Sequence, residues 1–552
     1  MSETNKEYQA EKKYPYSENS FLFPFIFGVD KFSEVDSLYK NISTYLDNND
    51  WEPIFYNKLA NNPNYTRKIY DAYKYFHKSA TDLLYPNDSN SIVKQFEYKK
   101  EQIDNNELKI NINKELDILH NFTLSITGIT LSFYKTGVGI LCIDLENTSH
   151  SDIDDVLKIN EYFRRLYPPY LTVDNKSNKL IADEIVLLEK DKPIFTANTF
   201  NYLSSIADQC NPNKNFSQIT HIVNHLLGNK IVFSEENNNY NLLSCKTLDD
   251  DRMFVVSSFT NKEMVSTLNQ WDGSNYAYQL DSFKKNNPDI GFVNKKHLEN
   301  TINKLYEYVF IDGDGLTCQD RQMKIKLLGD HLYTRWIDYG SIYGVTQHSM
   351  VLLANDDFPC HAFKNLYKNM AILVLTQRAS IISMDEQTSK LVKEIDDSVN
   401  LNDTLIEKIR KLQENYIILL NQILSFEPTG QEQGIEIYEM LQRFMFIKEE
   451  HGHIEKQIKS LYEMSIVASN SKKQKQDGRR NLILFVIAIL SFIKEFIFLF
   501  NYILVFFKTY PHALIIAIIL LFSCFIFKPR NYIMDTIKKI KNKITKFIKK
   551  IT

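Results

Sequence analysis

Two long apolar runs near the C-terminal end dominate the pattern of hydrophobic and polar positions along the chain. The first covers residues 481–507, the second covers residues 513–527, and only the stretch KTYPH separates them. A bilayer core of about 30 Å is crossed by about 20 helical residues. The pattern therefore predicts a hairpin of two transmembrane helices. The alternative is a buried hairpin of a soluble protein, in which apolar runs of this length are rare.

Basic residues lie at both outer ends of this hairpin. Arg479 and Arg480 precede the first run, and Lys528 and Arg530 follow the second. Because lysine and arginine accumulate in cytoplasmic segments next to membrane spans, both ends are expected in the cytoplasm and KTYPH outside. Residues 1–17 contain no apolar core of a signal peptide. The expected location is the inner (plasma) membrane, with two spans and both termini in the cytoplasm.

Two charged residues, Lys494 and Glu495, interrupt the first apolar run. A charge inside a membrane span costs roughly 3 kcal/mol on insertion scales and is usually accepted where it faces water or a partner helix. One hairpin cannot enclose water, so the pair predicts a homo-oligomer with a pore lined by both residues. In the alternative, the helix tilts, Lys494 extends toward the interface and Glu495 pairs with it.

Residues 528–552 combine apolar residues at steps of three and four with nine lysines and arginines and a single aspartate. The whole chain has a net charge of −3, so this segment is basic and the remainder is acidic. The pattern predicts an amphipathic helix on the anionic inner leaflet. A solvated basic tail is the alternative.

Long helices are predicted upstream of the membrane. Apolar residues alternate by four and three over residues 405–423 and 437–461, which is typical of two antiparallel coiled-coil-like helices. No proline follows Gly434 before the first apolar run, so the second helix is expected to continue into the membrane. We assign residues 385–480 to this stalk.

The remaining chain predicts an α+β cytosolic domain. Residues 1–110 are expected to be mainly helical, and residues 111–384 to form an α/β ligand-sensing body. Within the body, residues 122–147 alternate around a Lys-Thr-Gly turn as a strand hairpin does. A helix follows, capped by Ser151 or Asp152 and stopped by Pro168. Further strands are expected at KIVFS, RMFVVSSF and SMVLLA.

Motifs of common catalytic sites are missing from the sequence. It contains no phosphate-binding glycine loop, GxSxG, HExxH or kinase signature, and its six cysteines form no CxxC pair. We therefore expect no enzyme, no catalytic residue, no metal ligand and no tightly bound cofactor. The stretch EEHGHIEKQ contains two histidines, but His451 falls on the apolar stripe and is expected to pack in the core.

Adjacent Arg164 and Arg165 lie among the tyrosines Tyr162 and Tyr167 in the stretch EYFRRLYPPY. Guanidinium forks bind phosphate oxygens, and aromatic rings stack on bases. The stretch is therefore a candidate site for a small nucleotide. A solvated helix end, with arginines at the favourable C-terminus, is the alternative.

Two further stretches are candidate ligand-binding segments. In LDDDRMFVV, Asp251 precedes Arg252 at the start of a strand, where a carboxylate can accept a hydrogen bond from a ribose hydroxyl; a plain turn is the alternative. The stretch YTRWIDYGSIYGVTQHS holds Arg335, Trp336 and Asp338, and structural packing of that loop is the alternative to ligand contact. The stretch DGDGLTCQD lacks the late glutamate of a calcium loop.

The predicted architecture resembles the CorA-like (2-TM-GxN) divalent-cation channel superfamily. The shared features are an acidic body, long helices, two C-terminal spans with a very short outer loop, and a basic tail. The resemblance covers about residues 385–552. It implies a pentamer and a divalent cation as possible cargo. That family ends its first span with Gly-Met-Asn, and at the corresponding place this chain has Leu499-Phe500-Asn501-Tyr502. Only Asn501 matches, which adds it to the predicted pore residues.

The stretches YKTGVGIL, INEYFRRLYPPY and YTRWIDYGSIYGVTQHS are similar to those of the CorA-like membrane effectors associated with type III CRISPR systems. This resemblance implies an antiviral channel that is activated by a nucleotide second messenger, an S-adenosylmethionine and AMP conjugate. The phosphate would bind Arg164 and Arg165, with Asp251 as a further contact, and no direct nucleic-acid binding is expected. The alternatives are a CorA-type magnesium transporter and a non-conducting membrane-anchored enzyme or scaffold.

Overall fold

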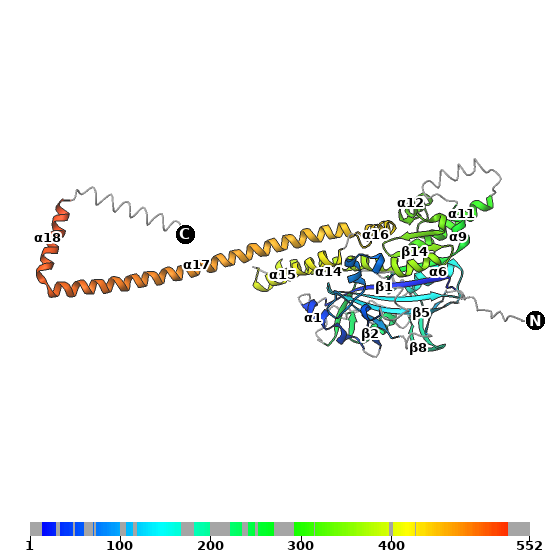
Figure 1. Ribbon diagram of the computed structural model, residues 1–552, viewed down its shortest axis with the longest axis horizontal. Coiled ribbons are helices and arrows are strands. Elements are labelled where there is room, and N and C mark those ends of the chain that lie inside the picture. The colour runs from blue at the N-terminus through cyan, green and yellow to red at the C-terminus, as the bar shows by residue number, and fades with distance from the viewer. Residues whose placement is uncertain are drawn as a thin grey trace, which may run out of the picture. The chain divides into compact units, whose positions relative to one another are not determined.

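The computed structural model divides the chain into two compact units, Met1–Ser465 and Ile466–Thr552, whose elements are labelled in Figure 1. The structure describes residues 14–28, 34–47, 50–59, 70, 73–99, 106–113, 119–166, 181–198, 221–233, 241–248, 252–269, 292–313, 315–396, 401–424 and 427–527. The predicted basic tail, residues 528–552, lies outside the described residues.

The described part of the first unit contains one large mixed sheet (Figure 1). Its main path runs β12-β13-β14-β11-β1-β6-β5-β4-β7-β8. Neighbours are antiparallel except for the parallel pairs β11/β14 and β9/β10. The strands are β1 (Ser17–Phe27), β2 (Trp51–Pro53), β3 (Val93–Tyr98), β4 (Asn106–Asn113), β5 (Leu119–Tyr134), β6 (Val138–Asn147), β7 (Glu184–Glu189), β8 (Lys192–Asn198), β9 (Ile231–Phe233), β10 (Leu243–Thr247), β11 (Phe254–Thr260), β12 (Leu332–Tyr333), β13 (Ser341–Val345) and β14 (Ser349–Ala354).

Helices cover both faces of this sheet. One hydrophobic cluster includes residues of α1 (Val35–Lys40), α6 (Ile153–Phe163), α8 (His221–Leu227), α9 (Lys262–Leu268), α11 (Phe292–Phe310) and α12 (Arg321–His331). The second cluster includes residues of α4 (Lys78–Leu84), α13 (Phe358–Ala362), η4 (Phe363–Tyr367), α14 (Lys368–Asp396), α15 (Asp403–Ile418), η5 (Leu419–Ile423), α16 (Glu432–Phe444) and the start of α17 (Ile447–Thr509). The described part of this unit also contains the short elements α2 (Tyr56–Leu59), η2 (Ile42–Tyr45) and η3 (Ile337–Tyr339), and α18 (Pro511–Phe527) follows α17.

Strand β1 shows how the sequence produces this layered arrangement. Successive side chains of a strand point to opposite faces, and Phe21 belongs to the first cluster while its neighbour Leu22 belongs to the second. Because both faces are covered, the strand reads as a continuous apolar run. Pro24 is tolerated because β11 pairs with β1 up to Leu22 and β10 pairs from Phe25, so the missing N–H falls where the partner changes.

Residues 1–110, expected to be mainly helical, contribute β1, β2, β3 and part of β4 in addition to their helices. The period-2 signal of β1 is hidden because apolar residues occupy both of its faces. Elsewhere, the expected strands are present. The hairpin of residues 122–147 forms β5 and β6 around the turn at Lys135, and β9, β11 and β14 occupy the three other predicted segments.

Ion pairs hold the start of α14 against the sheet. Lys368 Nζ donates to both carboxylate oxygens of Asp144 on β6, at 2.9 Å each, and Asp144 also accepts from Ser20 Oγ on β1 at 2.5 Å. One turn earlier, Lys364 Nζ donates to Glu18 at 2.6 Å and to Glu146 at 2.9 Å. The Lys368 and Asp144 side chains are only 14% and 16% exposed, so this pair is largely withdrawn from water.

The predicted stalk helices are present, with one difference. The apolar stripe of residues 405–423 is buried along α15 and η5, and His451 on α17 contacts the Tyr416 hydroxyl at 3.0 Å. The second helix does not run unbroken from Gly434, because α16 ends at Phe444 and α17 begins at Ile447. The break occurs at Phe446, whose φ of 55° is left-handed and cannot continue an α-helix.

Candidate functional site, an arginine cluster at the end of α6

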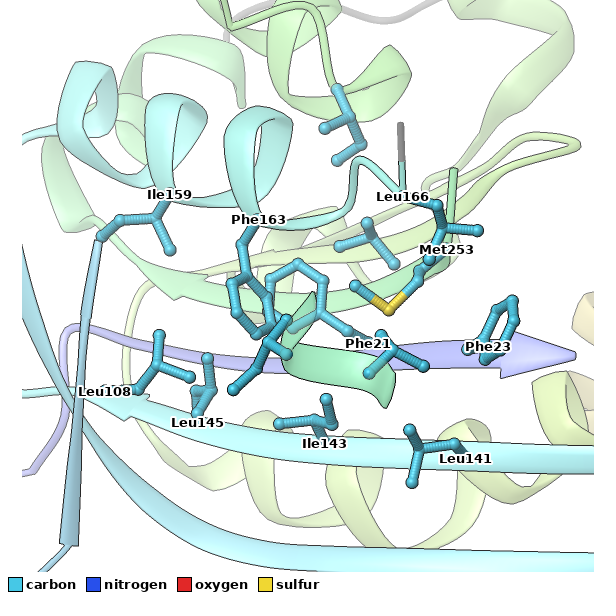
Figure 2. Packing of buried hydrophobic residues seen from close by; sticks show 14 of the residues in the cluster. Phe21, Phe23, Leu108, Leu141, Ile143, Leu145, Ile159, Phe163, Leu166 and Met253 are labelled. Carbon is cyan, nitrogen blue, oxygen red and sulfur yellow. The ribbon is translucent and has the colours of Figure 1, made fainter. Parts of the chain in front are cut away.

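The cluster begins where α6 ends. Asp152 caps the helix by accepting from the Asp154 N–H at 3.0 Å, as the sequence predicted. From there, α6 buries Ile159 and Phe163 against the sheet, beside Phe21 of β1 (Figure 2). Packing of this face fixes the position of the helix, and therefore also the positions of Arg164 and Arg165, which follow its last residue.

Both arginines are buried and share one carboxylate. Arg164 and Arg165 are 3% and 7% exposed. Arg165 donates from Nε at 3.1 Å and from Nη2 at 2.5 Å to Glu161 Oε1. Arg164 Nη2 donates to Glu161 Oε2 and, at 2.7 Å, to the carbonyl oxygen of Ile311 after α11. The pair is thus not a solvated helix end, which was the alternative interpretation of the sequence.

Arg164 has N–H groups that donate to no acceptor among the described residues. Its Nε and Nη1 atoms are buried and have no hydrogen-bond partner among the described residues. Burial lowers the pKa of Arg164 to about 10, Glu161 opposes this, and the nearby Arg165 and Arg252 lower it further. At neutral pH the guanidinium therefore stays charged, and one of its edges can still donate to an acceptor that the described residues do not supply.

A second segment brings a third guanidinium to the cluster. Arg252 forms an antiparallel bridge with Arg165, and the Met253 N–H donates to the Arg164 carbonyl at 2.8 Å. Arg252 Nη2 lies 3.1 Å from His348 Nε2. Because β11 and β14 are parallel neighbours, the residues that precede them, Arg252 and His348, lie at the same edge of the sheet.

Among the described side chains of this cluster, the guanidinium groups outnumber the carboxylates. Glu161 faces two guanidinium groups, and Arg252 lies near enough to influence the pKa of Arg164. Asp312 is also close, but its Oδ2 accepts from the Thr317 N–H at 2.6 Å and from Thr317 Oγ1 at 2.8 Å. Buried guanidinium groups in excess favour an anion, and their planar forks match phosphate and carboxylate oxygens. Among the described residues, no group of three or more metal-ligating side chains is found.

The structure separates the third predicted segment from this cluster. Arg335 lies beside the start of β13, where the Ser341 N–H donates to the Trp336 carbonyl at 3.1 Å, whereas His348 follows the end of that strand. Arg335 donates to Glu436 at 2.7 Å and to Glu432 at 2.9 Å on α16. The predicted ligand residues Arg335, Trp336 and Asp338 therefore lie at the opposite end of β13 from Arg252.

The other predicted ligand residues have different positions. Tyr162 is 1% exposed and belongs to the hydrophobic cluster under α6. Tyr167 and Asp251 lie outside the described residues. The sequence prediction omitted Glu161, although its spacing of three and four residues from the arginines is the usual signal of an ion pair on a helix. Nothing in the sequence indicated the Ile311 carbonyl.

The second candidate site is the apolar part of α17. One helix in the described structure, Ile447–Phe506, is long and apolar enough to cross a membrane, and none of its most apolar window is buried. Lys494, Glu495 and Asn501 lie on this helix. At 3.6 residues per turn, Asn501 falls on the same face as Lys494, seven positions earlier, whereas Glu495 is rotated by about 100°.

Comparison with known proteins returns no matching family model, no matching curated protein and no matching solved structure.

Proposed function

We propose that the chain forms a homo-oligomeric membrane channel that opens when a small nucleotide binds the arginine cluster. The observation that carries the proposal is Arg164, a 3% exposed guanidinium with two nitrogens that have no hydrogen-bond partner in the described part of the chain. Buried donors normally have partners, so an open buried edge favours a ligand with acceptor oxygens. The phosphate of a nucleotide supplies them, and its negative charge matches the excess of arginine.

The membrane part of the proposal rests on α17 and on the second apolar run. The second helix, α18, covers Pro511–Phe527, and this length is short for a membrane span. In the predicted hairpin, the flanking residues add the length that is needed to cross the bilayer. Lys494 and Asn501 share a face of α17, which gives the first helix a polar stripe. If several copies of the helix surround a water-filled pore with this stripe facing inward, Lys494 is not exposed to lipid.

The proposed biological role follows from the resemblance to type III CRISPR membrane effectors. The activating ligand would be a nucleotide second messenger, such as an S-adenosylmethionine and AMP conjugate, and channel opening would harm the infected cell. A ligand shifts a conformational equilibrium only by its differential affinity for the two states. The nucleotide must therefore bind the open form of the channel more tightly than the closed form.

Ion flux from liposomes containing the purified chain tests this function. We expect little flux without ligand and a large increase with an adenine nucleotide conjugate, because only the ligand stabilises the open state. Equal flux with and without nucleotide would instead indicate a constitutive transporter. Asn501 would then be the residue that it retains from the Gly-Met-Asn motif of the CorA-like family. No flux under either condition would contradict a channel and favour a membrane-anchored scaffold or enzyme.

The hairpin topology has its own test. In a cysteine-free background, we expect H512C to react with a membrane-impermeant maleimide added outside intact cells. K472C, which precedes the first apolar run, should react only after permeabilisation. These outcomes follow from the basic residues that flank the hairpin. Labelling of both positions from outside, or of neither, would contradict two spans with a short outer connection.

A further inference from the structure

The Glu161 carboxylate binds the two arginines in the way that an anionic ligand would. Its Oε1 accepts two hydrogen bonds from Arg165 and its Oε2 accepts one from Arg164, which is how guanidinium forks also bind phosphate. We propose that Glu161 is an internal counter-anion that occupies the arginine cluster in the free protein, and that the phosphate group of the ligand replaces it. This inference rests on the proposed function, because it concerns how the same cluster takes up its ligand.

Position and burial favour Glu161 as an effective competitor. It lies in the last turn of α6, three and four residues before Arg164 and Arg165, so its carboxylate reaches both guanidinium groups without a change in the backbone. It is 2% exposed, and a competitor tethered at such short range acts at a high effective concentration. An incoming anion must therefore overcome this contact before it binds fully.

Glu161 nevertheless leaves the cluster incompletely satisfied. Arg164 Nε and Nη1 have no partner among the described residues, and the single charge of Glu161 is shared between two guanidinium groups. A phosphate presents more acceptor oxygens and up to two negative charges. It can begin at the open edge of Arg164 and then take over the donors that Glu161 holds.

The exchange would act on the end of α11. Ile311, whose carbonyl accepts from Arg164, has a φ of 50°, which is strained for a β-branched residue. A Cβ on Gly313 would lie 2.8 Å from the Glu161 Cβ and 2.5 Å from the Leu157 carbonyl, so this turn packs directly on α6. Because the same Arg164 Nη2 atom donates to Glu161 and to the Ile311 carbonyl, replacement of Glu161 by an anion would also act on the contact with this strained turn. Anion binding would thereby be linked to a change in shape.

The test compares phosphate binding to the full chain in detergent and to the variant Glu161→Gln, which keeps the shape and removes the charge. Binding is followed by the shift in melting temperature with inorganic phosphate and, separately, with AMP. With an internal competitor, the apparent affinity equals the intrinsic affinity multiplied by the fraction of time in which the site is free of that competitor. We expect E161Q to bind phosphate at least about tenfold more tightly, and to melt at a lower temperature than the wild type when no anion is present.

The matched control is Glu307→Gln. Glu307 is also a buried carboxylate, 6% exposed, and pairs with Lys304 at 2.7 Å on α11. Its removal should leave phosphate affinity unchanged. If E161Q is too unstable to purify, E161D retains the charge but shortens its reach, and it should show a smaller gain in phosphate affinity.

The outcomes separate this inference from the proposed function. If the wild type and the Glu161 variants bind phosphate and AMP equally well, the cluster binds anions but Glu161 does not compete, and the inference is overturned alone. If neither phosphate nor AMP shifts any of the proteins, both the inference and the nucleotide site are overturned.

Discussion

Replacement of Lys368 with methionine is expected to lower the free energy of unfolding of the first unit by about 3 kcal/mol, because it leaves Asp144 ionised and without its main partner. The value is at the lower end for a broken buried pair, since Asp144 keeps 16% of its side-chain surface exposed. Urea unfolding of the full chain in detergent, followed by tryptophan fluorescence, measures the change.

A double-mutant cycle tests the origin of this effect. Asp144→Asn alone leaves Lys368 charged without its partner and should also destabilise the unit, whereas D144N/K368M removes both charges and should recover much of the loss. Lys408→Met is the control, since Lys408 pairs with Glu394 while both side chains are more than 40% exposed; its effect should be far smaller. Strict additivity of the two single variants would contradict a direct ion pair.

The pH dependence of stability follows from the same two groups. Burial opposes ionisation of Asp144, but Lys368 and Ser20 outweigh it and hold the pKa below the usual 3.8. Burial likewise opposes the charge on Lys368, and Asp144 raises its pKa well above the usual 10.5. The carboxylate contributes stability above pH 3.8, which is lost as the pH falls through its folded pKa. The lysine contribution is complete below pH 10.5 and is lost as the pH rises through its folded pKa.

Local signals in the sequence predicted elements but not their assembly. The β5/β6 hairpin, the Asp152 cap and the apolar stripe of residues 405–423 each depend on residues close together in the chain, and each is present. The break at Phe446 escaped prediction, because phenylalanine has no preference for a left-handed conformation. Interior elements with apolar residues on both faces, such as β1, give no clear period to identify them.

In the candidate site, too, local features were predictable from the sequence and long-range contacts were not. Arg164 and Arg165 were identified from their adjacent positions among tyrosines, whereas the bridge between Arg165 and Arg252, and the contact of Arg252 with His348, depend on long-range strand pairing. That pairing joins residues almost a hundred positions apart, and no local pattern encodes it. For the same reason, the sequence did not show that Arg335 lies at the other end of β13.

Simultaneous replacement of Glu161, Arg164 and Arg165 with glutamine is expected to abolish the nucleotide response while the chain stays folded. Removal of the two arginines alone would leave Glu161 buried without its partners and cost about 3 kcal/mol or more. Loss of function in that double variant would therefore not separate sensing from folding. The triple variant removes all three buried charges together, so that no unpaired ion remains at this point of α6.

Melting temperature and liposome flux, each measured with and without nucleotide, distinguish the two effects. The triple variant should melt as a cooperative unit, with no shift on addition of nucleotide and no ligand-dependent flux. Arg410→Gln is the matched control, because Arg410 pairs with Glu407 and Glu414 on the exposed face of α15 and lies outside the cluster. It should retain the full response. A triple variant that still melts at a higher temperature with nucleotide and still conducts would exclude the end of α6 as the sensor, since the donors that define the site would then be dispensable.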